Sequence, residues 1–78
     1  MKQRVRLKFP QHLIKEPVIF TMAKNFDVMP NIRMARVTDS FGEMILELEG
    51  TEEHMTSGLN SLSELGISVE LIEDDIPE

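Results

Sequence analysis

The stretch NIRMARVTDSFGEMILELEG, residues 31–50, decides the fold because it has the pattern of two strands joined by a short turn. Residues 43–49 alternate between glutamates and an apolar side made of Met44, Leu46 and Leu48. Residues 38–42, TDSFG, contain the Asp, Ser and Gly that are common in turns. The stretch therefore predicts an antiparallel hairpin whose first strand covers residues 31–37.

A helix is predicted on each side of this hairpin. Pro17 suits the first position of a helix because its missing N–H needs no intrahelical partner there, and apolar residues then recur at helical spacing: Ile19, Met22, Ala23 and Phe26. After the hairpin, Thr51 is a natural N-cap, and Gly66 supplies a left-handed stop. Between them runs an apolar stripe made of Met55, Leu59 and Leu62.

Two further strands, one near each end of the sequence, complete the pattern. Residues 4–9, RVRLKF, alternate with Val5, Leu7 and Phe9 inward, and residues 67–73, ISVELIE, alternate with Ile67, Val69 and Leu71 inward. Two interleaved β-α-β units with right-handed crossovers give an antiparallel four-stranded sheet of order 4-1-3-2 with both helices on one face. The predicted fold is therefore α+β and ferredoxin-like (β-α-β-β-α-β), with one domain over residues 1–73 and an acidic tail over residues 74–78.

The charge is distributed unevenly along the chain. All eight Lys and Arg lie in residues 1–38 beside two acids, whereas residues 39–78 hold twelve acids and no Lys or Arg. In the predicted sheet order the outward faces of neighbouring strands alternate in sign, and opposite charges across strands contribute about 0.2–1 kcal/mol each. The asymmetry therefore favours a self-complementary sheet face over a charged arm or tail.

Several classes of protein are not supported by the composition. The chain has no cysteine and only His12 and His54, so the usual ligands of zinc, iron–sulfur clusters and haem are missing and no metal or cofactor is expected. No apolar run approaches the roughly 18 residues of a membrane span, and no signal core precedes the first strand, so the expected location is the cytoplasm. Strands one and three lack outward aromatics for base stacking, so no nucleic-acid binding is expected.

No catalytic constellation is evident either. Asp39 and Ser40 lie in the predicted turn, where short polar residues form turns more often than active sites. His54 follows the start of the second helix and has no acidic partner beyond its sequence neighbours to orient it as a general base. We therefore expect a protein that is not an enzyme.

The strand at residues 31–37 is unusual because both of its faces contain apolar residues. Strict alternation puts Ile32 and Met34 on one face and Ala35 and Val37 on the other. In the predicted order this strand lies at the sheet edge, where another chain often pairs or a small ligand often lodges. A twisted edge strand with incidental apolar residues explains the pattern equally simply.

At these residues the chain resembles the NIL domain family, which takes its name from an Asn-Ile-Leu signature at the start of this strand. The resemblance covers nearly the whole chain and rests on LKFP at 7–10, Pro17, Asn31-Ile32, Ala35, Gly42, LELEG at 46–50 and ELGISVE at 64–70. The third signature position departs from the family because it is Arg33.

The resemblance implies one of two settings. In one group of the family the domain is the regulatory tail of the ATPase subunit of the methionine ABC importer, where paired domains bind methionine. In the other it precedes a ferredoxin module with two four-iron clusters in sulfur-metabolism proteins. The start of this chain, directly on the first strand, resembles the second group. Because the cluster cysteines are missing, a free-standing or excised domain is expected.

The resemblance also implies a ligand site at the mouth of the edge strand. Asn31 matches the signature asparagine, and an amide can accept from an ammonium group and donate to a carboxylate; capping of the turn after Pro30 is the alternative role. Met29, Ile32 and Met34 are predicted to contact a thioether. Arg33 is expected to pair with a glutamate of the third strand, or else with a ligand carboxylate.

The leading hypothesis is a non-catalytic homodimeric regulatory domain that senses methionine or a related sulfur amino acid. The alternative is a protein-interaction module without a ligand, for an iron–sulfur or sulfur-assimilation partner. An ABC-transporter partner is also consistent with the first of the two family groups.

Overall fold

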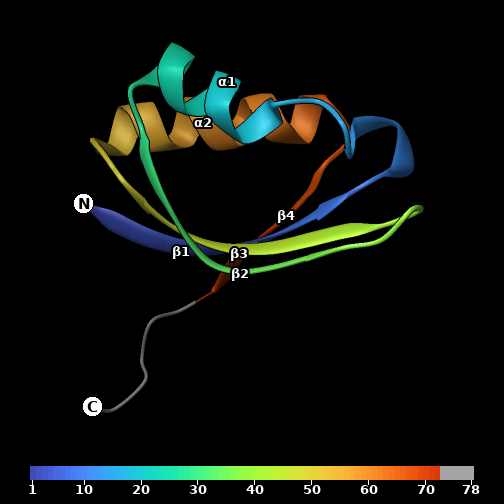
Figure 1. The fold of residues 1–78 in the computed structure, drawn as a ribbon. Helices are drawn as coiled ribbons and strands as arrows, with labels where there is room; N and C mark the ends of the chain where they lie inside the picture. The colour runs from blue at the N-terminus through green and yellow to red at the C-terminus, as the bar shows by residue number, and fades with distance from the viewer. Residues whose placement is uncertain (73–78) are drawn as a thin grey trace, which may run out of the picture.

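The computed structural model describes residues 1–72, and its elements follow the predicted order (Figure 1). Four strands form one antiparallel sheet in the order β2-β3-β1-β4. The strands are β1 (Lys2–Phe9), β2 (Met29–Val37), β3 (Gly42–Glu49) and β4 (Ser68–Ile72), and the helical segments are the 3-10 turn η1 (Gln11–Leu13) and the helices α1 (Val18–Phe26) and α2 (Glu52–Glu64). The predicted ferredoxin-like α+β fold is confirmed.

Both helices lie over the same face of the sheet, as Figure 1 shows. Of the helices within residues 1–72, none is long and apolar enough to cross a membrane. The predicted domain boundary at residue 73 and the acidic tail over residues 74–78 lie outside the described residues.

The hydrophobic core fills the space between the sheet and the two helices. It is centred on side chains with no exposed surface: Val5, Leu7, Leu46, Leu48 and Leu62. Met22 of α1 and Met55 of α2 close it from the helix side. Burying one such side chain is worth about 1.5–3 kcal/mol, so the alternating strands and the helical stripe together hold the two layers in place.

The helix ends follow the predicted signals closely. Pro17 is the N-cap of α1, one residue before the predicted position, and α1 ends at Asp27 in the left-handed conformation (φ 56°). The hydroxyl Oγ1 of Thr51 accepts a hydrogen bond of 3.1 Å from the backbone N–H of His54, which confirms the N-cap of α2. Gly66 has φ 98°, which confirms the predicted stop after α2.

The open face of the sheet carries the predicted alternation of charge. Arg4 of β1 lies 3.4 Å from Glu47 of β3 between Nη2 and Oε2. Arg6 reaches in both directions, with Nη1 3.2 Å from Oε1 of Glu70 on β4 and Nε 3.5 Å from Oε2 of Glu43 on β3. These contacts between opposite charges on neighbouring strands favour the observed strand order and register.

One residue on the inner face of the sheet is not buried. Leu71 pairs with the buried Val5 in register and so lies on the inner face, as predicted, but it is 60% exposed. The reason is that β4 is an edge strand of the sheet and Leu71 lies near its end. Ile67, just before β4, is buried as predicted.

Candidate functional site

The predicted site lies where β2 begins and β3 ends. Met29 pairs with Glu49, and Asn31 pairs with Glu47, in the antiparallel register of these two strands. The start of β1 reaches the same place, because Lys2 also pairs with Glu49 on the other side of β3. The ends of three strands therefore bring side chains from residues 2, 29–31 and 47–49 to one corner of the sheet.

A cleft of about 300 Å³ lies at this corner and is lined by six residues: Lys2, Met29, Pro30, Asn31, Glu47 and Glu49. They provide one ammonium group, two carboxylates, one amide and a thioether. The ion pair with Arg4 at 3.4 Å engages Glu47, whereas Glu49 is exposed at the rim. The cleft thus offers both signs of charge to a zwitterion and an apolar surface beside them.

A β-bulge divides the predicted site residues. Ile32 opposes Leu46 and so faces the helices, whereas Met34 opposes Ile45 and so faces the open side of the sheet, because the register shifts between them. The expectation that Ile32 and Met34 share a face is therefore wrong. Of the five predicted residues, only Met29 and Asn31 line the cleft.

Arg33 is the extra residue of the bulge. It has no residue opposite it on β3, and it forms no ion pair within residues 1–72. The expected pair between Arg33 and a glutamate of the third strand is therefore wrong, and Arg36 is the residue that opposes Glu43. The bulge also explains how the departure from the family signature is accommodated, since the longer side chain at this position is exposed.

Three charged residues of the cleft were not predicted as site residues: Lys2, Glu47 and Glu49. In the sequence they are part of the alternating outward faces of two strands, where solvent exposure is the ordinary explanation. The signal that could have found them is the antiparallel register, which places the start of the first strand opposite the end of the third. That register joins two strands that lie far apart in the sequence, so spacing along the chain does not reveal it.

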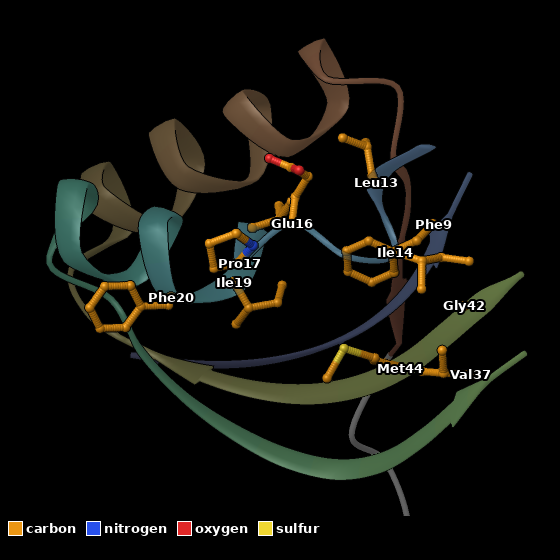
Figure 2. Close-up of a pocket in the computed structure, with 11 residues that line it drawn as sticks. Phe9, Leu13, Ile14, Glu16, Pro17, Ile19, Phe20, Val37, Gly42 and Met44 are labelled. Atoms are coloured by element: carbon orange, nitrogen blue, oxygen red, sulfur yellow. The ribbon is translucent and has the colours of Figure 1, made fainter. Parts of the chain in front are cut away.

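A second cavity, of about 170 Å³, lies under α1 and beside the turn of the hairpin (Figure 2). Ile14 and Ile19 approach it from the helix side, and Val37 and Met44 approach it from the sheet. Glu16 is the only charged residue in its lining. This cavity extends the hydrophobic core and lacks the opposite charges that would orient an amino acid.

The residues considered for catalysis lie in the hairpin turn and in the first turn of α2. In the hairpin turn, the backbone N–H of Ser40 donates to Oγ1 of Thr38 at 3.4 Å, and the N–H of Thr38 donates to the carbonyl of Phe41 at 2.7 Å, so Asp39 and Ser40 belong to a closed turn. Nδ1 of His54 lies 3.8 Å from Oδ2 of Asp27, an acidic neighbour that the sequence did not indicate. The side chain of Asp27 is 93% exposed and that of His54 is 46% exposed, and neither lines the cavities described above.

The fold and the cleft together define the class of protein: a small ferredoxin-like α+β domain with a polar cleft at the edge of its sheet. The chain belongs to the NIL domain family, whose model matches residues 3–71.

Curated relatives extend this assignment. The chain is 31% identical over 72 residues to the methionine import ATP-binding protein MetN of Coxiella burnetii, a match that covers 87% of this chain and 20% of that relative. It is 32% identical over 73 residues to the methionine import ATP-binding protein MetN 2 of Listeria innocua, and this match covers 88% of this chain and 22% of that relative. The chain thus spans about a fifth of the length of the curated relatives that it matches.

Solved structures share the fold. The crystal structure of the C-terminal domain of an ABC transporter/ATP-binding protein from Enterococcus faecalis superposes with a TM-score of 0.79 at 22% identity, covering 94% of this chain and 86% of that one. The de novo designed protein Foldit4 superposes with a TM-score of 0.55 at 10% identity, covering 94% and 96%. Both likenesses concern the arrangement of strands and helices.

Proposed function

We propose that this domain is a non-catalytic regulatory module, acting in the cytoplasm, that binds methionine or a related sulfur amino acid in the cleft at the start of β2. The observation that carries the proposal is the composition of that cleft, where Asn31 lies among an ammonium group, two carboxylates and a methionine. The relatives that match over most of this chain are methionine import ATP-binding proteins, which supports the same ligand.

Each part of a methionine molecule has a matching group in the cleft. The ammonium of Lys2 suits the ligand carboxylate, and the carboxylate of Glu49 suits the ligand ammonium. The amide of Asn31 can donate to the first and accept from the second, which fixes the direction of the backbone of the ligand. Met29 and Pro30 offer apolar surface to the thioether.

Thermal unfolding tests this proposal. Because the chain contains no Trp or Tyr, unfolding is best followed by far-ultraviolet circular dichroism. A ligand at about 100 times its Kd adds about 2.7 kcal/mol to the free energy of unfolding, which raises the Tm of a domain of this size by about 10–20 °C. We expect this rise with L-methionine and no comparable rise with 3-(methylthio)propylamine, which lacks the carboxylate. An unchanged Tm at tens of millimolar L-methionine would contradict the proposal.

The same module is proposed to be a homodimer. The free edge of β2 carries exposed apolar side chains, with Met29, Ile32 and Val37 between 57% and 69% exposed. An unpaired edge with such residues is a template on which another chain can pair. Sedimentation equilibrium at high micromolar concentration should therefore give twice the chain mass, and Ile32→Lys should give the monomer, whereas the control Leu71→Lys should not. A monomeric parent chain would contradict this prediction.

A protein-interaction module for an iron–sulfur or sulfur-assimilation partner is the second candidate function. The exposed apolar side chains of the β2 edge favour it, because a partner strand would pair there without any small ligand. Binding of such a partner should not depend on L-methionine, which separates the two candidates.

A further inference from the structure

A cavity larger than the two described above lies on the helix side, away from the cleft at β2. This cavity, called here the helix groove, has a volume of about 520 Å³ and runs between α1, the segment that precedes it, and the C-terminal half of α2. Its apolar lining comes from Leu13, Pro17, Val18, Met22, Phe26, Leu62 and Leu65. Leu65 is 50% exposed, so the groove presents apolar surface to the outside.

The charge of the helix groove has a single sign. Glu16 and Glu64 line it, and it contains no Lys, Arg or His. The last turn of α2 also carries no basic residue, so the negative end of the helix dipole is not compensated there by a cation. An occupant that places positive charges beside its apolar residues would satisfy both features.

We propose that the helix groove is a docking site for a basic amphipathic helix of a protein partner. A groove between two packed helices accepts the apolar face of a third helix, with anchor residues one turn apart entering the groove. Lys or Arg residues flanking those anchors would meet Glu16 and Glu64. A second copy of this chain fits poorly, because a symmetric contact would place the same carboxylates against each other.

This inference is independent of the amino-acid site. The helix groove is formed by the helical layer, whereas the cleft is formed by the open side and edge of the sheet. A partner and a small ligand could therefore be bound at the same time. The domain would then bind the amino acid on one surface and the protein partner on another.

The test uses two probe peptides and the full 78-residue chain. Both are 14-residue helical peptides with blocked ends and with Leu on one face. They differ only in carrying Lys or Glu at all the remaining positions. An amide-resolved NMR titration should give saturable shifts with the Lys peptide, centred on residues lining the helix groove such as Val18, Thr21, Leu62 and Leu65. The Glu peptide should give none at the same concentrations.

Matched variants separate docking from general attraction to an acidic protein. The double variant Glu16→Gln, Glu64→Gln should weaken binding of the Lys peptide about fivefold. The control Glu52→Gln, Glu53→Gln changes the net charge equally at the far end of α2 and should change the affinity less than twofold. Leu65→Ser should also weaken binding, whereas Leu71→Ser, which alters a similarly exposed leucine on β4, should not.

Three results would overturn the proposal. The first is no saturable shift with the Lys peptide up to millimolar concentration. The second is equal weakening by the two double variants, which would show attraction to net charge alone. The third is a set of shifts centred on the open face of the sheet. Loss of methionine binding would not change the binding of the Lys peptide, so each of the two proposals can fail without the other.

Discussion

Replacing Leu46 with alanine is expected to lower the free energy of unfolding by about 2–5 kcal/mol. Leu46 has no exposed surface and lies on β3, where it opposes Val5 of β1 and Ile32 of β2. A chain of this length has a total stability of about 4–12 kcal/mol, so the cavity left by the truncation removes a large part of it. Chemical denaturation followed by circular dichroism measures the change.

The matched control is Leu71→Ala. The same truncation at a side chain that is 60% exposed should change the free energy of unfolding by about 0.5 kcal/mol or less. If the two variants unfold at the same denaturant concentration, the core does not lie between β3 and the helices as described.

Replacing Asn31 with alanine is expected to weaken L-methionine binding about 10- to 100-fold. Hydrogen bonds to charged groups are worth about 1.5–3 kcal/mol each, and about 1.4 kcal/mol corresponds to tenfold in affinity. Asn31 lies in the cleft opposite Glu47 and is exposed, so its loss should leave the fold intact. Isothermal titration calorimetry of the folded variant gives the change directly.

Asn60→Ala provides the control, because Asn60 is an exposed asparagine on α2, away from the sheet edge. It should bind L-methionine as the parent chain does. An unchanged affinity in the Asn31 variant would show that the site is elsewhere. Retained binding of a protein partner by that variant would in turn favour the interaction module.

The fold was predictable because several local signals agree with one another. The alternation around Leu7 and Leu46, the N-cap at Thr51 and the stop at Gly66 each specify one element, and short connections limit how the elements are joined. The charge pattern also favours the strand order, because Arg6 of β1 forms ion pairs with Glu43 of β3 and Glu70 of β4.

The site was only partly predictable, and the bulge at Arg33 is the main reason. Strict alternation gives one assignment of faces along β2, and a single extra residue reverses it from Met34 onward. A bulge arises from the pairing of two strands and leaves little local signal at Arg33 itself. Lys2 and Glu49 come together through the pairing of β1 with β3, two strands far apart in the sequence, so their contributions could not be assigned from spacing along the chain.

The most direct measurement is an amide-resolved NMR titration of the chain with L-methionine. If the cleft at the start of β2 is the binding site, saturable shifts will centre on Lys2, Met29, Asn31, Glu47 and Glu49. The amides that line the helix groove will move little. A flat titration to millimolar concentration, or shifts centred elsewhere, would contradict the proposed amino-acid site.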